Sequence, residues 1–279
     1  MNVFYIVANP EKEGAADTEK EIADYLHSRG AKAVCQDWKD FLGGRYTQPS
    51  QVPEDTECVI TIGGDGTLIQ AARDLAGRGI PFVGVNRGHL GYLTQVSRRE
   101  DMFSMLDALL EGKYTLERRM MLEGRILRTG KIVAGDIALN EIVISRRDML
   151  KPLHFRLLVN GEFLNDYTAD GMIFATPTGS TAYNLSAGGP IIAPGARMMV
   201  LTPICSHALN ARSIVLPAED QLTIQVPEEG HMLAFDGNLA GELYCGDQIL
   251  IRKSIVETIL VQLKKISFLQ NLSNKMIGV

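Results

Sequence analysis

The most constraining feature of the sequence is a short apolar run that ends in a cluster of glycines. Residues 58–62 (CVITI) are rich in β-branched side chains, and Gly63-Gly64-Asp65-Gly66-Thr67 follows at once. Residues 68–75 then show a helical pattern. A strand that is apolar on both faces and leads through glycines into a helix is typical of a parallel sheet covered by helices.

The rest of the first third repeats this alternation. Residues 3–8 and 81–85 are short apolar runs of strand type, and residues 18–29 form an amphipathic pattern that ends at Gly30. We therefore predict that residues 1–120 form an α/β domain, Rossmann-like in having a parallel sheet with helices on both faces.

The pattern changes after about residue 120. Short strand-like runs occur at 125–127, 132–134 and 141–144, and helical periodicity is largely absent. Asn160-Gly161 lies between two apolar runs, which is the strongest short-range signal for a β-hairpin. We predict a β-rich antiparallel domain over residues 121–253 and a tail, residues 254–279, that packs back on the first domain.

Composition excludes several classes of function and partner. The net charge of −5 argues against nucleic-acid binding, and no apolar run approaches the roughly 18 residues of a membrane helix. The N-terminus lacks the features of a signal peptide, so the cytoplasm is the expected location. The four cysteines show no C-x-x-C spacing and are predicted to be reduced and mostly buried. Scattered histidines without H-E-x-x-H give no metal-ligating residue to predict.

The glycine cluster is the first candidate for chemistry. Its N–H groups and the start of the following helix can point at phosphate oxygens. It matches neither G-x-G-x-x-G nor the P-loop. Asp65 is unexpected there because a carboxylate repels phosphate. Three interpretations stay open: a turn residue, a group that takes a proton from an attacking hydroxyl, or a group that helps hold a metal.

Two further segments point to a nucleotide. Residues 170–190 run from a strand into a loop rich in glycine and hydroxyl groups, which suits a polar ligand such as a nucleoside, although an ordinary long turn has similar composition. Asn140-Glu141 stands at the head of a strand and, taken alone, is typical of a solvated turn.

Together these segments resemble the NAD kinase family in order and spacing. The resemblance includes the GGDGT cluster, Asn140-Glu141, the 170–183 segment with T-P-T-G-S-T-A-Y, and residues 84–93 (GVNRGHLGYL). GGDGT alone is shared with diacylglycerol-type lipid kinases and, as GGDGS, with phosphofructokinases. The combination with Asn-Glu and TPTGSTAY separates NAD kinases from both.

The resemblance implies ATP-dependent phosphorylation of the adenosine-ribose 2′-hydroxyl of NAD, giving NADP, with a divalent metal ion, Mg²⁺, on the nucleotide. It implies Asp65 as the proton acceptor and assembly into a homodimer or homotetramer. Asn140 and Glu141 are expected at the adenosine and its ribose, Asp170 at the nicotinamide end, and Tyr183 at the adenine. The full set of implied cofactor-binding residues is Gly63, Gly64, Gly66, Thr67, Asn140, Glu141, Lys151, Thr168, Asp170, Thr181, Ala182, Tyr183, Asn184, Leu185, Ser186, Cys205 and Asn238.

Some of these roles have alternatives. Lys151 is equally consistent with a solvated lysine, and Cys205 with a buried core thiol. A lipid or sugar kinase that uses GGDGT is the alternative enzyme, and a dinucleotide-binding regulator without chemistry is the alternative outside enzymes. The sequence leaves open whether polyphosphate replaces ATP, whether NADH is accepted, which metal is preferred, and which oligomer forms.

Overall fold

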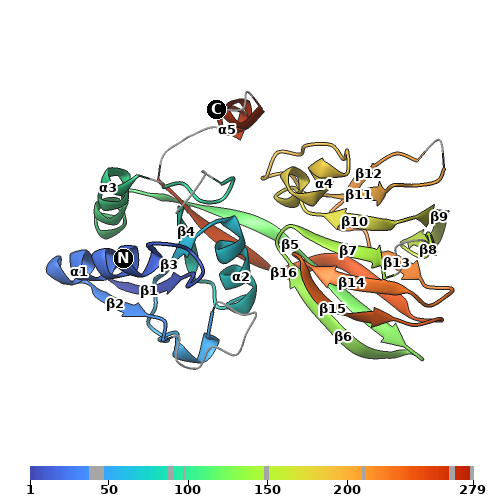
Figure 1. Ribbon diagram of the computed structural model, residues 1–279, viewed down its shortest axis with the longest axis horizontal. Coiled ribbons are helices and arrows are strands. Elements are labelled where there is room, and N and C mark those ends of the chain that lie inside the picture. Colours follow the sequence, from blue (N-terminus) through green and yellow to red (C-terminus); the bar gives the residue numbers. More distant parts are fainter. Residues whose placement is uncertain are drawn as a thin grey trace. The chain divides into compact units, whose positions relative to one another are not determined.

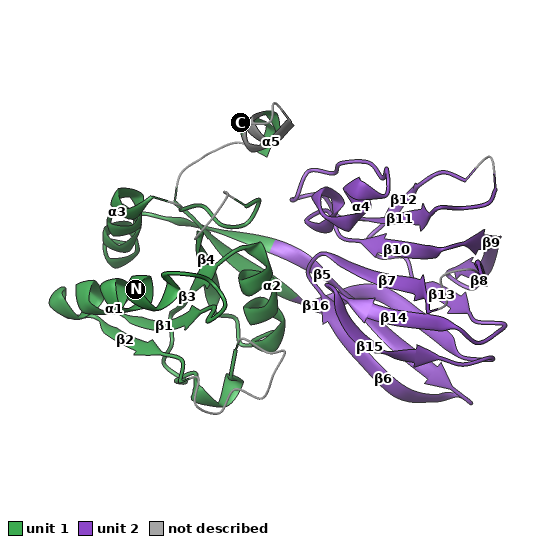
Figure 2. Ribbon diagram, in the orientation of Figure 1, with its two compact units in different colours: residues 1–118, 257–279 green, residues 119–256 purple. Residues whose placement is uncertain are grey.

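The computed structural model describes residues 1–37, 47–86, 91–96, 98–147, 151–208, 211–263 and 268–276. The chain divides into two compact units, residues 1–118 with 257–279 and residues 119–256 (Figure 2). Two long strands, β5 (Thr115–Arg128) and β16 (Gln248–Gln262), have residues in both units. Each unit is described below by itself.

The first unit is built on a parallel sheet. Strands β1 (Val3–Ala8), β2 (Lys32–Cys35), β3 (Cys58–Gly63) and β4 (Pro81–Asn86) lie in the order β2-β1-β3-β4, and every adjacent pair is parallel (Figure 1). The end of β16 pairs with β4, also in parallel. The parallel α/β arrangement predicted for the first part of the chain is confirmed.

Helices cover both faces of this sheet. Helices α1 (Ala15–Ser28) and α3 (Arg99–Leu110) bury Ile22 and Leu106 in one cluster with Phe4 and Ile60. Helix α2 (Asp65–Asp74) covers the other face. In β4, Gly84 lies between Val83 and Val85 of that cluster, so it faces the opposite side of the sheet, and there the Leu68 side chain of α2 lies beside it. The 3₁₀ turn Pro49–Gln51 and helix α5 (Phe268–Met276) complete the described elements of the unit.

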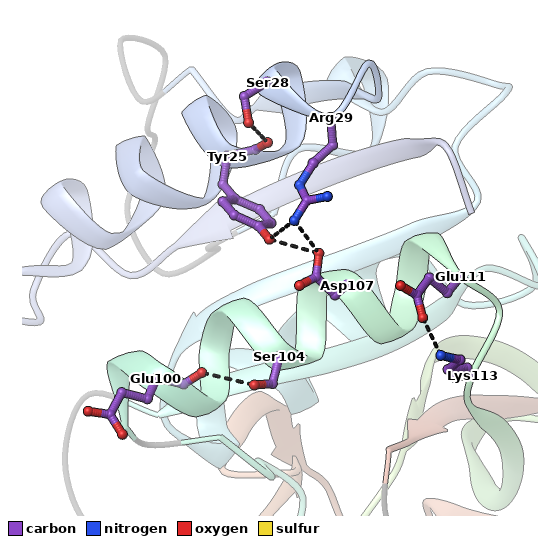
Figure 3. Close-up of polar contacts among 8 residues, drawn as sticks. All are labelled: Tyr25, Ser28, Arg29, Glu100, Ser104, Asp107, Glu111 and Lys113. Atoms are coloured by element: carbon purple, nitrogen blue, oxygen red, sulfur yellow. Dashed lines mark hydrogen bonds and ion pairs between the residues drawn. The ribbon is translucent and has the colours of Figure 1, made fainter.

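Helices α1 and α3 also share a polar contact (Figure 3). The Tyr25 hydroxyl donates to Asp107 Oδ1 over 2.7 Å, and Arg29 reaches both that hydroxyl, at 2.8 Å, and Asp107, at 3.2 Å. The Tyr25 ring packs on Phe103 with 4.9 Å between centroids. The ion pair is exposed to solvent and so contributes little, which leaves apolar burial as the main source of the contact's stability.

The second unit is a two-layered antiparallel structure. One layer is a six-stranded sheet in the order β12-β11-β10-β7-β14-β15, and the other contains β5, β6, β8, β9, β13 and the first part of β16. Its shared core includes Phe155, Phe174, Phe235 and Ile249. The strand bounds are β6 (Lys131–Ala138), β7 (Glu141–Arg146), β8 (Leu153–Val159), β9 (Glu162–Ala169), β10 (Gly171–Ala175), β11 (Met198–Ile204), β12 (Ile214–Pro217), β13 (Leu222–Gln225), β14 (His231–Phe235) and β15 (Asn238–Leu243).

The predicted hairpin at Asn160-Gly161 is confirmed. Asn160 has φ 52° and Gly161 has φ 84°, and the two residues join β8 to β9. Thr129 and Gly130 join β5 to β6 in the same way, with φ 48° and 77°. Positive φ at both central residues is what a two-residue turn between right-twisted strands requires.

Two expectations are corrected. The cysteines were expected to be mostly buried, but only Cys58 is, whereas Cys35, Cys205 and Cys245 are exposed and all four are free. Each exposed thiol lies at or just beyond the end of a strand, where the chain leaves the core. The last strand also continues beyond residue 253, where the sequence predicts the end of the β-rich segment, since β16 runs from Gln248 to Gln262. No helix within the described ranges is long and apolar enough to cross a membrane.

Candidate functional site

The glycine cluster lies at the carboxyl end of β3, in the first unit. Gly63 ends the strand, Gly64 caps α2, and Asp65 is the first residue of the helix. A Cβ atom at Gly64 or Gly66 would meet nothing within 4 Å, so the main chain is open on that side. Open main chain at the N-terminus of a ten-residue helix suits a phosphate group, as the sequence predicts.

The Asp65 carboxylate is hydrogen-bonded to the segment that follows β4. Its Oδ2 accepts the N–H of Tyr92 at 2.6 Å. Its Oδ1 accepts the N–H of Leu93 at 3.3 Å, the N–H of Thr94 at 3.0 Å and the Thr94 hydroxyl at 2.9 Å. Asp65 therefore orders residues 92–94, a role that is closest to the turn interpretation. An ionised carboxylate has about four acceptor sites, and Oδ2 still has one to offer.

Thr67 and Gly63 face the interior of the unit. Thr67 is 2% exposed, and a Cβ atom at Gly63 would collide with its hydroxyl. Asn9 Nδ2 lies 3.4 Å from the same hydroxyl, while its Oδ1 accepts the N–H of Glu11 at 2.9 Å. The Thr67 side chain thus packs the loop rather than lining it. Asn9 was missed by the sequence interpretation, because an Asn-Pro pair after a strand is indistinguishable from an ordinary turn.

Gly91 provides a test of the Asp65 contacts. A Cβ atom there would lie inside the Asp65 carboxylate, so Gly91→Ala must displace that carboxylate from residues 92–94. We expect a loss of about 1–3 kcal/mol in the free energy of unfolding, measured in urea. Gly66→Ala is the matched control, because its Cβ meets no atom and alanine favours a helix. Equal stability of the two variants would contradict the packing described.

Asn140 and Glu141 form a fixed turn at the start of β7, in the second unit. The Asn140 carbonyl accepts the N–H of Thr176 at 2.8 Å, and a Cβ atom at Gly179 would collide with that carbonyl. Asp236 accepts the N–H groups of both Asn140 and Glu141, at 2.7 and 3.0 Å. The Asn140 side chain is half-buried and makes no side-chain hydrogen bond to the residues that the structure describes. Its amide is therefore available to a ligand.

The Glu141 carboxyl group is buried beside this turn. The residue is 7% exposed, and its Oε2 has no hydrogen-bond partner among the described residues. Burial, with a smaller contribution from the negative charge of Asp236, raises the pKa of Glu141 to about 8, while the N–H of Tyr183 acts in the opposite direction. A buried acceptor without a partner and with a displaced pKa is typical of a ligand-binding position.

The TPTGSTAY segment packs against the Asn140-Glu141 turn. It contains the 3₁₀ turn Gly179–Thr181 and leads into the short helix α4 (Tyr183–Ser186). Tyr183 and Leu185 are exposed, at 44% and 40%, so the Tyr183 ring is free to stack on a base. Ser186 is also exposed, whereas Thr181 and Ala182 are half-buried.

The side chain of Asn184 is bonded within the loop. It is fully buried, its Nδ2 donates to the carbonyls of Ser180 and Pro190 at 3.0 Å, and its Oδ1 accepts the Thr202 hydroxyl at 2.7 Å. Its side chain therefore holds the loop together, with both donor hydrogens of the amide used inside the loop. Arg119 supports the same segment, because its buried guanidinium donates to the Thr178 hydroxyl at 3.3 Å. No local sequence signal marks Arg119.

Four other predicted residues lie near the start of β10, at the end of the strand away from Glu141. Asp170 precedes that strand and pairs with Arg146 at 3.0 Å, and its N–H bonds the carbonyl of Ile204. Cys205 follows Ile204 with φ 45°. Thr168 lies two residues before Asp170. Lys151 is exposed and lies two residues before Leu153, the β8 residue that pairs with Ala169. Glu141 pairs with the far end of β10, at Ala175.

Three remaining expectations concern a loop, a turn and a metal. Residues 87–90 of the GVNRGHLGYL segment lie outside the described residues. Asn238 is exposed and its Nδ2 lies 3.4 Å from the Asp236 carbonyl. Among the described residues, no group of three or more His, Cys, Asp or Glu could hold a metal ion.

Comparison with known proteins matches both units. Residues 4–114 match the ATP-NAD kinase N-terminal domain, and residues 139–263 match the ATP-NAD kinase C-terminal domain. An NAD kinase of Lachnospira eligens is 44% identical over 297 residues, covering 99% of this chain and 100% of its own length.

Solved structures agree with this assignment. A yeast NADH kinase complexed with NADH superposes with a TM-score of 0.87 at 25% identity, covering 100% of this chain and 88% of its own. An NAD kinase from Archaeoglobus fulgidus in complex with ATP shares the fold, with a TM-score of 0.78 at 23% identity and 100% coverage of both chains. The resemblance drawn from the motifs is confirmed: the chain belongs to the ATP-NAD kinase family.

Proposed function

We propose that the chain catalyses the reaction of its family, ATP-dependent phosphorylation of NAD, and that the acceptor is the 2′-hydroxyl of the adenosine ribose. Membership of the family supports the two substrates. The observation that carries the acceptor site is the Asn140-Glu141 turn. Among the described residues, the Asn140 amide has no side-chain partner and the buried Glu141 Oε2 has no hydrogen-bond partner. A carboxylate there accepts from two neighbouring ribose hydroxyls.

NAD is proposed to lie along β10. Asn140 and Glu141 hold the adenosine ribose at one end, and Tyr183 stacks on the adenine. Asp170 meets the nicotinamide at the other end, five residue steps from Ala175, or roughly 17 Å along the strand. The exposed Lys151 at the Asp170 end is proposed to lie near the pyrophosphate. This spacing supports an extended dinucleotide.

Asp65 is proposed as the proton acceptor for the 2′-hydroxyl. Of its two oxygens, Oδ1 already receives three hydrogen bonds and Oδ2 receives one. Oδ2 is therefore the oxygen with room for the hydroxyl proton. The main chain of Gly64 and Gly66 and the N-terminus of α2 face phosphate oxygens, where the partial positive charge of the helix offsets negative charge that develops on the transferred group.

The metal ion is proposed to arrive with ATP. Mg²⁺ is usually held by substrate phosphates with one or two carboxylates rather than by a protein cage. Bound there, it would neutralise charge on the phosphates during transfer. We also propose the cytoplasm as the location and a homodimer or homotetramer as the assembly, in keeping with the family resemblance.

A coupled assay tests the proposal. The protein is incubated with NAD, ATP and Mg²⁺, and NADP is read out with an NADP-specific dehydrogenase. We expect NADP to form only when all three are present. Parallel reactions replace ATP by polyphosphate, NAD by NADH, and NAD by diacylglycerol or a sugar phosphate. Phosphorylation of a lipid or sugar without NADP formation would favour the alternative kinase, and binding of NAD without turnover would favour a regulator.

A further inference from the structure

Asp236 lies in the turn between β14 and β15 and supports the Asn140-Glu141 turn through its carboxylate. Its Oδ2 accepts the N–H of Leu139 at 2.8 Å, and its Oδ1 accepts the N–H groups of Asn140 and Glu141. Its own N–H donates back to the Glu141 carbonyl at 3.0 Å. Asp236 has φ 45°, a conformation that is uncommon outside glycine and asparagine-like residues.

We propose that Asp236 is a positioning residue for NAD, which fixes the Asn140-Glu141 turn in its binding form and places a second carboxylate beside Glu141. The inference rests on the proposed function. Asp236 acts through main-chain groups and through charge, and it needs no contact with the substrate itself.

The positioning part follows from how the turn is bonded. The N–H of Asn140 goes to Asp236 and its carbonyl goes to Thr176, whose hydroxyl bonds the Leu139 carbonyl at 2.6 Å. All main-chain hydrogen-bonding groups of Asn140 are thus occupied, and only its side-chain amide remains for a ligand. Loss of the Asp236 carboxylate would leave three consecutive N–H groups without their acceptor.

The ionisation part follows from the two carboxyl groups that share this turn. Asp236, from the β14–β15 turn, faces Glu141 with a like charge, and the N–H of Tyr183, from α4, is the group that favours its ionised form. Burial and, to a smaller extent, the charge of Asp236 raise the pKa of Glu141, so the carboxylate that accepts ribose hydroxyls is populated above about pH 8 and is lost as the pH falls. Removal of the Asp236 charge should extend the carboxylate form to lower pH.

The test is the pH dependence of kcat/KM for NAD between pH 6 and 9.5 in the full chain. For the native enzyme we expect a rise to a plateau with its midpoint near pH 8, which reports ionisation of the free enzyme. In Asp236→Asn the midpoint should move to lower pH by about one unit. KM for NAD on the plateau should rise about tenfold with kcat little changed, because the new amide opposes the Leu139 N–H.

Asp247→Asn is the matched control. Asp247 also accepts a main-chain N–H at a turn, from Tyr244 at 2.9 Å, and pairs with Arg128, but among the described residues it makes no hydrogen bond to the Asn140-Glu141 turn. Its variant should keep the native midpoint. Asp236→Ser, which keeps an uncharged acceptor, is a second variant in case the first does not fold.

Each outcome is decisive for the inference. A folded Asp236 variant with the native midpoint would overturn it, as would loss of the fold in both variants while Asp247→Asn stays folded, since Asp236 would then be a global structural residue. Failure of the native enzyme to form NADP would instead contradict the proposed function, so the two failures are distinguishable.

Discussion

Asp65→Asn is expected to lower kcat for NAD phosphorylation by about 10²–10⁴-fold, the usual contribution of a positioned general base. An amide cannot take the proton of the 2′-hydroxyl. NAD should still bind, because Asn can hydrogen-bond the same hydroxyl and a negative charge near the pyrophosphate is removed. Steady-state kinetics and direct NAD titration of the same preparation measure the two effects separately.

The hydrogen bonds of Asp65 predict that this variant is also less stable. If the Asn oxygen takes the place of Oδ1, which receives three hydrogen bonds, its amide nitrogen faces the N–H of Tyr92, and two donors then oppose each other. We expect about 1–3 kcal/mol of destabilisation from that mismatch. Thr94→Val is the control, because it removes one bond to Asp65 but keeps the carboxylate. A folded Asp65→Asn enzyme with near-normal turnover would leave Asp65 as a turn residue alone.

Glu141→Gln is expected to weaken apparent NAD affinity by roughly tenfold to 150-fold, the equivalent of about 1.5–3 kcal/mol for a hydrogen bond to a charged group. The full effect should appear at pH 9, where native Glu141 is ionised, because its pKa is raised to about 8. At pH 6.5 native Glu141 is protonated and resembles Gln, so the difference between the two enzymes should shrink.

The measurement is KM for NAD and KM for ATP at both pH values. KM for ATP should change little, since Glu141 is proposed to contact only the dinucleotide. Equal losses for both substrates, or a loss that is independent of pH, would mean that Glu141 supports the fold of the turn and does not bind the ribose as a carboxylate.

Local patterns in the sequence predicted much of the fold. Residues 58–75 carry strand, glycines and helix in one continuous stretch, and Asn160-Gly161 carries its turn geometry in two residues. Strand length was harder to predict. Ser254, Glu257 and Thr258 interrupt the apolar pattern of β16, but Ser254 and Thr258 are buried in the structure, so the strand continues where composition indicated a tail.

The candidate site was predicted only in part, because its supports are distant in sequence. Asp236 bonds residues 95–97 positions away, and the Asn9–Thr67 contact joins residues 58 positions apart. In the sequence, Asp236-Gly237 and Asn9-Pro10 are both typical of ordinary turns. Asn184 follows directly on the TPTGSTAY motif, yet its amide bonds Ser180, Pro190 and Thr202, so part of this segment supports the loop itself.

The hydrogen bonds of Asp65 and Asp236 also determine which substitutions near them would preserve the two loops. Each carboxylate receives three consecutive main-chain N–H groups, at residues 92–94 and at residues 139–141. A main-chain N–H is present in every amino acid except proline. Among the twenty residue types, proline alone therefore cannot donate this bond at those six positions. At positions 65 and 236, by contrast, even a change to asparagine removes one of the two acceptor oxygens. Each loop is therefore much more sensitive to substitution of its aspartate than to substitution of the three residues whose N–H groups the aspartate accepts.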